Sequence, residues 1–317
     1  MKPELFRLFD VGAPAYLLLL LFGFMLATAM GAFLTRAEGH DPDIFVDLGI
    51  SMLIWGIVGA RLLHVFADGF FMDYVHLCTD PSKVAWSISK AECVSTRVDG
   101  VWDLAANACH PKERDCLRWA NFTAGGLTFY GGLILATIRA IYKLRPTTLG
   151  FWGAADVSSV GIPLGLALGR LGCLLGGCCF GSISDAPWAL RFPGWSDASR
   201  MQAKQGLLSA ASMPSLHVHP TQIYESLMSL TVAAWCLFVA FPRKRFAGHA
   251  FVQFAGLYAV GRFVIEIWRN DDRGGGLGLS TSQWVSVWLL LFAMTTYVIR
   301  RRTALVNASA NAVIDLP

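Results

Sequence analysis

The chain has 317 residues, of which 55% are hydrophobic and only 15% are charged, whereas about 25% are charged in an average soluble domain. With a mean hydropathy of +0.50, it is not a disordered chain, a collagen-like fibre or a small disulfide scaffold. The 26 basic and 22 acidic residues leave a net charge of +4, which is too small to indicate a protein that binds nucleic acid. The composition instead indicates a polytopic membrane protein.

Seven segments are long and apolar enough to cross a membrane, for which a helix needs about 20 largely apolar residues. In chain order, the predicted spans are residues 12–35, 48–67, 122–142, 157–181, 223–241, 250–268 and 281–299. We expect the first span to be retained and not cleaved as a signal peptide, because Glu4 and Asp10 weaken the positive charge before it and its apolar stretch is longer than a usual signal core. The sequence therefore predicts an all-α membrane protein with seven transmembrane helices.

Basic residues in the connecting loops predict the orientation, since lysine and arginine concentrate on the cytoplasmic side. Three clusters of them follow the third, fifth and seventh spans: Arg139, Lys143, Arg145, Arg243, Lys244, Arg245, Arg300, Arg301 and Arg302. Seven spans place all three clusters on one side, so we expect the N-terminus outside and the C-terminus in the cytoplasm. Residues 1–302 would form a single transmembrane domain with outward loops at about 68–121 and 182–219. A short flexible cytoplasmic tail is expected at 303–317.

The eight cysteines fall into separate groups. Four lie in the first long outward loop: Cys78, Cys93, Cys109 and Cys116. An oxidising compartment favours two disulfides among them, and their spacing leaves all three pairings open. Cys236 lies inside the fifth span, where we expect it to pack as a small apolar side chain. The other three, Cys173, Cys178 and Cys179, lie near the end of the fourth span.

Arginines inside the spans point to a ligand, because a charge at mid-membrane costs a few kcal/mol and normally faces a partner or a wet cavity. Four qualify: Arg61, Arg170, Arg262 and Arg269. Arg262 and Glu266 are four residues apart and share one helix face, which suits an ion pair. The arginines nevertheless outnumber the available acids, Glu225 and Glu266. A guanidinium matches phosphate oxygens with a planar fork of donors, so the surplus predicts a lipid-phosphate site.

Three motifs mark where this site would form. The pair Gly131-Gly132 suits close helix packing or contact with a headgroup. Residues 169–181 contain five glycines around Arg170, which makes an unbroken helix doubtful, and a broken membrane helix usually lines a cavity. Pro220 suits a helix start, which places the side chains that follow it near the outer surface: Gln222, Tyr224 and Glu225.

In order and spacing, these motifs resemble those of the prolipoprotein diacylglyceryl transferase family over most of the chain. The resemblance rests on Gly59-Ala60-Arg61, Phe129-Tyr130-Gly131-Gly132, residues 169–181, residues 219–225, residues 261–266 and residues 279–284. It implies transfer of the diacylglyceryl group of phosphatidylglycerol to the lipobox cysteine thiol of a preprolipoprotein, with release of glycerol 1-phosphate. It also implies no metal, no organic cofactor and a multi-pass location in the bacterial inner membrane. The expected partners are phosphatidylglycerol, the lipobox segment and membrane lipid, without nucleic acid.

The resemblance also implies roles for individual residues. Arg170 and Arg262 would bind the phosphate and stabilise charge as it leaves, with Glu266 orienting Arg262. Tyr130 occupies the fourth catalytic position. Gly181 would close its motif where a side chain would obstruct the lipid. The other expected substrate-binding residues are Arg61, Gly131, Gly132, Gln222, Tyr224 and Arg269.

The sequence departs from the family pattern at three polar positions. Tyr130 replaces a histidine that is a candidate base, and a tyrosine with a pKa near 10 serves poorly in that role. Cys173 replaces an asparagine and Cys178 a glutamate. A diverged paralogue with an altered acceptor, or a thiol-redox or lipid-binding membrane protein, is therefore the alternative interpretation.

The cysteine cluster near the fourth span allows three interpretations. Cys173, Cys178 and Cys179 could form a disulfide and act as a thiol-redox site. They could instead bind a soft metal together with His217 or His219. In the third interpretation they are small polarizable side chains that pack around a helix break.

Overall fold

The computed structural model is mostly helical and describes residues 4–8, 11–67, 69–86, 88, 90–94, 98–121, 126–269, 275–276 and 278–314. The chain divides into two compact units, each described below by itself. The first unit comprises Met1–Val46 and Thr147–Pro317, and the second comprises Asp47–Pro146. Within the described residues, six helices are long and apolar enough to cross a membrane. The structure therefore confirms a multi-pass helical membrane protein.

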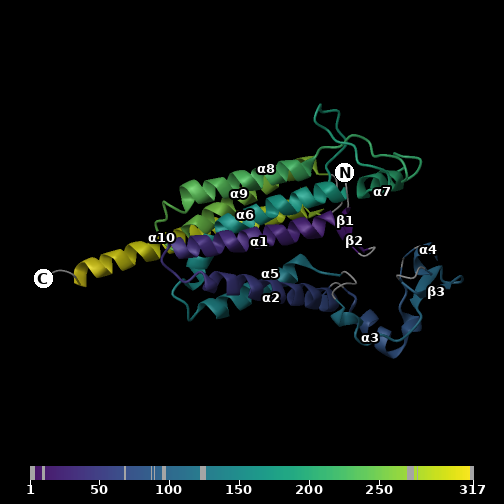
Figure 1. Ribbon diagram of the computed structural model, residues 1–317, viewed down its shortest axis with the longest axis horizontal. Helices are drawn as coiled ribbons and strands as arrows, with labels where there is room; N and C mark the ends of the chain where they lie inside the picture. Colours follow the sequence, from purple (N-terminus) through teal and green to yellow (C-terminus); the bar gives the residue numbers. More distant parts are fainter. Residues whose placement is uncertain are drawn as a thin grey trace. The chain divides into compact units, whose positions relative to one another are not determined.

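The first unit is a bundle of long helices (Figure 1). Its long elements are α1 (Ala15–Ala37), α6 (Gly150–Gly176), α8 (Thr221–Trp235) with the π-helical turn η4 (Cys236–Ala240), α9 (His249–Ile265) with the 3-10 turn η5 (Glu266–Trp268), and α10 (Thr281–Ile314). Shorter elements are β1 (Glu4–Leu8), β2 (Val11–Pro14), α7 (Asp197–Lys204), β5 (Gly275–Gly276) and β6 (Leu279–Ser280). Helix α6 packs against α1, α8 and α9, and α10 packs against α9.

Helix α6 is the centre of this unit because small residues let its neighbours approach closely. A Cβ atom added at Gly161 would lie 2.9 Å from the carbonyl oxygen of Ala27 in α1. Half of the apolar stretch of α6 is buried, against 17% for α1 and α10, so α6 is the most enclosed helix of these three. Asp156 of α6 is fully buried and accepts the backbone N–H groups of Gly248 and Phe251, which caps the positive end of α9.

The second unit contains two longer helices and a disulfide-bonded loop region. Its elements are α2 (Asp43–Ala67), α3 (Phe71–Thr79), η1 (Pro81–Lys83), α4 (Lys90–Cys93), β3 (Gly100–Asp103), β4 (Ala108–Pro111), η2 (Arg118–Ala120) and α5 (Phe129–Leu144). Strands β3 and β4 pair antiparallel. The turn between them is held by Asp103, whose carboxylate accepts the N–H groups of Ala105 and Ala106; these bonds hold the pKa of Asp103 below its ordinary value.

Two disulfides form within the second unit, as predicted from the loop cysteines. Cys78 bonds to Cys116 and Cys93 bonds to Cys109. The pairing is nested because the hairpin of β3 and β4 folds back on α4. This brings Cys109 of β4 to Cys93 at the end of α4, and it returns Cys116 to the end of α3.

Several predicted boundaries differ from those observed. The span predicted at 122–142 corresponds to α5, which begins at Phe129 and has 16 residues; residues 122–125 lie outside the described part. At 1.5 Å per residue, α5 is about 24 Å long, shorter than the hydrocarbon core of about 30 Å. The fourth span begins at Gly150 and ends at Gly176, and not at 157 and 181. The expected flexible tail is continuous with α10 as far as Ile314.

The nested pairing can be tested by peptide mapping. We expect non-reduced digests of purified protein to contain cross-linked peptides joining Cys78 to Cys116 and Cys93 to Cys109, and these should separate on reduction. A digest in which Cys78 is linked to Cys93, or in which all four thiols are freely alkylated, would contradict it.

Candidate functional site

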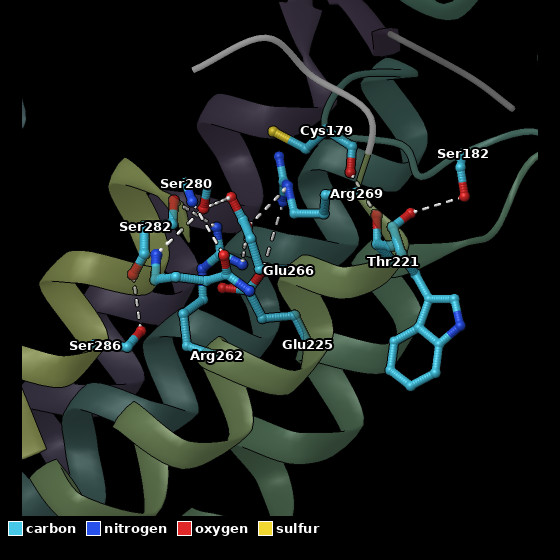
Figure 2. A network of polar contacts seen from close by, with 12 residues as sticks. Cys179, Ser182, Thr221, Glu225, Arg262, Glu266, Arg269, Ser280, Ser282 and Ser286 are labelled. Carbon is cyan, nitrogen blue, oxygen red and sulfur yellow. Dashed lines mark hydrogen bonds and ion pairs between the residues drawn. The ribbon is translucent and has the colours of Figure 1, made fainter. Parts of the chain in front are cut away.

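Three arginines and two glutamates meet at one end of the first unit; Figure 2 labels four of them, Glu225, Arg262, Glu266 and Arg269. Arg170 comes from α6, Glu225 from the first turns of α8, Glu266 from η5, and Arg262 and Arg269 from α9 and the residue that follows η5. These five side chains are the charged network. They were predicted from separate motifs, and the fold brings all five together.

One half of the network is built by the end of α9. Arg262 Nη1 lies 2.6 Å from Glu266 Oε2, the ion pair expected from residues four apart on one helix. The helix then tightens into the 3-10 turn η5 and ends in the extended residue Arg269. This change of direction brings Arg269 Nε to 3.8 Å from Glu266 Oε2, so a single carboxylate faces two guanidinium groups.

The other half is centred on Glu225, which is fully buried. Its Oε1 lies 2.9 Å from Arg170 Nη2, and its Oε2 lies 3.8 Å from Arg269 Nη1. Glu225 thereby joins α6 to the end of α9, with Arg269 shared between the two halves. Removing one member of a buried ion pair typically costs about 3–5 kcal/mol, because the remaining charge is left uncompensated.

Serines at the start of α10 complete the surroundings of the network. Ser280 Oγ donates to Glu266 Oε1 at 2.8 Å, and Arg262 Nη2 donates to Ser282 Oγ at 3.1 Å. Ser280 and Gln283 also exchange bonds with each other's backbone N–H groups, the reciprocal arrangement of a capping box. Sequence reasoning missed Ser280 and Ser282 as site residues, although the Ser-x-x-Gln spacing before an apolar run was the available signal.

The charge and exposure of the network indicate where an anion would enter. Among the residues that the structure describes, three guanidinium groups of the network face two carboxylates. The side chain of Arg170 is 19% exposed, whereas those of Arg262 and Arg269 are 8% and 2% exposed. An anionic ligand would therefore contact Arg170 first, with the other two guanidinium groups behind it.

Gly181 lies where the chain after α6 crosses the residues that carry the network. Its backbone N–H donates to the carbonyl of His219, and it forms an antiparallel bridge with Arg269. A Cβ atom at Gly181 would lie 2.5 Å from the carbonyl oxygen of Trp268. The glycine is thus required by backbone packing beside Arg269, a reason that was not foreseen in the sequence.

Gln222 and Tyr224 follow Pro220 as predicted and have different environments. Gln222 is 1% exposed, and its Nε2 donates to the carbonyl of Cys178 at 2.6 Å. Tyr224 Oη accepts a bond from Trp188 Nε1 at 2.7 Å and lies 3.1 Å from the ring of His219. Gln222 therefore anchors the segment after α6, while Tyr224 belongs to an aromatic cluster beside it.

The cysteines at the end of α6 converge. The Sγ atoms of Cys173, Cys178 and Cys179 lie within 4.8 Å of one another, and among the described residues neither His217 nor His219 joins this group of donor atoms. The pKa of the Cys179 thiol is held below its ordinary value, because the two neighbouring thiols hydrogen-bond to it and nearby guanidinium groups attract its charge. The pKa of the Cys178 thiol is raised by its hydrogen bonds with Cys173 and Cys179 and by burial.

The remaining predicted residues lie in the second unit. Arg61 is 3% exposed and donates to the carbonyls of Arg118, Trp119 and Gly126, so it links α2 to η2 and to Gly126. Tyr130 is half-exposed at the start of α5. The proximity of these side chains to the charged network stays a prediction.

Close helix packing accounts for the glycine pair at the start of α5. A Cβ atom at Gly131 would lie 2.3 Å from the carbonyl oxygen of Gly59 in α2, and one at Gly132 would lie 2.9 Å from that of Gly56. Of the two roles that the pair suits, the structure supports helix contact, and contact with a headgroup stays a prediction.

Comparison with known proteins agrees with this arrangement of motifs. A family model described as prolipoprotein diacylglyceryl transferase matches residues 3–299. The phosphatidylglycerol–prolipoprotein diacylglyceryl transferase of Corynebacterium diphtheriae is 29% identical over 91% of this chain and 88% of its own length. Its namesakes from Paenarthrobacter aurescens and Clostridium tetani are 28% and 24% identical, over 90% and 95% of this chain and 78% and 98% of their own lengths. The chain therefore belongs to the prolipoprotein diacylglyceryl transferase family.

Proposed function

We propose that this chain transfers the diacylglyceryl group of phosphatidylglycerol to the lipobox cysteine thiol of preprolipoproteins and releases glycerol 1-phosphate. Its relatives carry the same donor and acceptor in their names. The observation that carries the proposal is the charged network, in which Arg170, paired with Glu225, lies at the partly exposed edge of a buried cluster of guanidinium groups and carboxylates. Lipoprotein maturation in the bacterial inner membrane is the process that this reaction serves.

The reaction places specific demands on the site. The acceptor thiolate attacks the glyceryl carbon that is bonded to a phosphate oxygen, so that a C–S bond forms and a C–O bond breaks. The electron pair of the broken bond stays on the phosphate, which leaves as glycerol 1-phosphate. Fixed cationic donors that are already in place when this charge develops lower the barrier. The charged network supplies such donors, because its guanidinium groups are held by carboxylates before any ligand binds.

Within this reaction, Arg170 and Arg262 bind the phosphate and stabilise the charge of the leaving group. Arg170 is the most exposed of the three arginines, which supports direct contact with the headgroup. Glu266 orients Arg262 through the 2.6 Å ion pair and is itself held by Ser280. Arg269 adds a third positive charge on the buried side of the network.

The other predicted residues complete the proposed site. Tyr130 stands at the position of the family's histidine, and we assign it a place beside the acceptor thiol. We assign the remaining substrate-binding roles to Arg61, Gly131, Gly132, Gly181, Gln222 and Tyr224.

We further infer seven transmembrane helices, with the N-terminus outside and the C-terminus in the cytoplasm. The arrangement of the first unit supports this orientation. Arg170 lies near the C-terminal end of α6, Glu225 near the start of α8 and Ser280 at the start of α10, whereas the basic residues 243–245 follow the opposite end of α8. The charged network then lies toward the outer leaflet, and the basic clusters lie toward the cytoplasm.

The proposed activity is tested by expressing the chain in a bacterium depleted of its own transferase and by following diacylglyceryl transfer from phosphatidylglycerol to a lipobox peptide with the detergent-purified protein. Rescue of growth together with transfer in vitro would support the proposal. A folded protein that does neither would favour the diverged paralogue.

Arg170→Lys and Arg262→Lys should each lower turnover about 10²–10³-fold, as expected when a donor to developing charge is lost. Lysine keeps the charge but lacks the planar fork that matches phosphate oxygens. Arg191→Lys is the matched control, because Arg191 donates to the carbonyl of Ser215 outside the network and its replacement should leave turnover near the parent rate. Near-parent rates for both network variants would mean that these arginines are structural.

Tyr130→His should preserve or raise the transfer rate. The imidazole has a pKa near 6.5, so it accepts a proton at neutral pH far more readily than a phenol with a pKa near 10. Initial rates at several pH values would measure the effect, with Tyr142→His as a control on another exposed tyrosine of the same helix. A large loss of activity in Tyr130→His alone would show that the phenol has its own role.

The proposed orientation predicts that a C-terminal reporter that works only in the cytoplasm is active, and that one that works only outside the cytoplasm is inactive. It also predicts that a cysteine introduced at Asp185 reacts with a membrane-impermeant reagent added to intact spheroplasts. Labelling of Asp185→Cys only after lysis, or a C-terminal reporter active only outside, would rule out this topology.

A further inference from the structure

Three thiols that have no role in the proposed transfer meet at the end of α6. The Sγ atoms of Cys173, Cys178 and Cys179 lie within 4.8 Å of one another, and all three are free cysteines. Cys173 is buried, whereas Cys178 and Cys179 are partly exposed, so the cluster can be reached from outside the helix bundle.

The way α6 ends explains why the first two thiols touch. Gly177 is left-handed, with φ at +75°, and its N–H donates to the carbonyl of Leu174, while the N–H of Cys178 donates to the carbonyl of Cys173. These two bonds form a Schellman ending, which commonly brings the side chain after the glycine against one in the last helical turn. In this chain that pair of side chains is Cys178 and Cys173.

The third thiol is brought in by an unusual backbone conformation. Cys179 has φ at +60°, a left-handed value that is uncommon for a residue other than glycine. The segment is then fixed to the first turn of α8, because Gln222 Nε2 donates to the carbonyl of Cys178 and Thr221 Oγ1 donates to that of Cys179. Figure 2 shows Cys179 and Thr221 at this junction beside Arg269. The three thiols are therefore presented by a backbone that is held independently of them.

We propose that Cys173, Cys178 and Cys179 bind one thiophilic metal ion, Zn²⁺ or Cu⁺, as three thiolate ligands. Thiolates favour these ions over hard cations such as Mg²⁺ and Ca²⁺. With Zn–S bonds of about 2.3 Å in tetrahedral geometry, sulfur atoms lie roughly 3.8 Å apart, so small side-chain rotations suffice to close the observed cluster around an ion. A fourth position on Zn²⁺ would remain for water or another ligand.

The charges around the cluster suit the resulting complex. Three thiolates with Zn²⁺ carry a net charge of −1, and with Cu⁺ a net charge of −2. Arg170 and Arg269 interact electrostatically with Cys179, so positive charge already lies beside the cluster. An occupied site would in turn compete with a phosphate for these guanidinium groups, which makes the metal a candidate inhibitor of the transferase.

The test measures metal binding by the full chain in detergent, without lipid or acceptor peptide, so an inactive transferase would not affect the result. The protein is reduced anaerobically, desalted and titrated with Zn²⁺ in one arm and with Cu⁺ in the other. We expect elemental analysis after a second desalting to find one ion per chain in at least one arm, and the tighter-binding ion identifies the preferred metal. Bound metal should also protect the three cysteines from alkylation, as read by mass spectrometry of the parent protein.

Variants distinguish ligands from bystanders. Cys178→Ser and Cys179→Ser should weaken binding by more than the roughly 10–100-fold that loss of an outer-shell partner costs. Cys236→Ser is the matched control, since Cys236 is a free buried cysteine of η4 outside the cluster, and it should bind like the parent. The proposal is overturned if the fully reduced parent retains no ion in either arm, or if Cys178→Ser and Cys179→Ser both bind as tightly as the parent. A disulfide within the cluster of a protein that binds no metal after reduction would assign it to thiol-redox chemistry instead.

Discussion

Glu225 is the residue on which the arrangement of the site depends. It is a fully buried carboxylate between Arg170 and Arg269, and it holds guanidinium groups that come from segments about one hundred residues apart. The carboxylate and the guanidinium groups need each other in an apolar bundle, because an unpaired buried ion is destabilising by several kcal/mol. The ion pairs of Glu225 therefore hold the ends of α6, α8 and α9 together.

The segment 169–181 combines three functions in one stretch of chain. Arg170 supplies the exposed edge of the charged network, the Schellman ending after it gathers the thiols, and Gly181 allows the chain to pass against the backbone of Trp268. The gathering of the thiols and the passage at Gly181 both depend on the helix ending at Gly176 and not continuing to 181. The glycines let the backbone bend and pass close to Trp268, while the predicted role of Gly181 in lipid access stays a prediction.

Much of this protein could be predicted from composition and local spacing. Long apolar segments cost too much to leave in water, so six of the seven predicted spans coincide with helices that are long and apolar enough to cross a membrane. The pair Arg262 and Glu266 followed from helical periodicity alone, since residues four apart share a face. Four cysteines in one long loop indicated two disulfides, which the structure confirms. The excess of arginine over acid inside the spans indicated an anion site, which stays a prediction.

Only the tertiary structure decided which groups became partners, because those contacts join residues that are distant in sequence. Spacing could not show that Glu225 faces both Arg170 and Arg269, nor which of three pairings the loop cysteines adopt. The start of α5 at Phe129 was missed because hydropathy alone does not locate the residue at which a helix begins. The need for glycine at 181 could not be seen in the sequence either. It arises from the carbonyl of Trp268, which reaches that position only when α9 has ended.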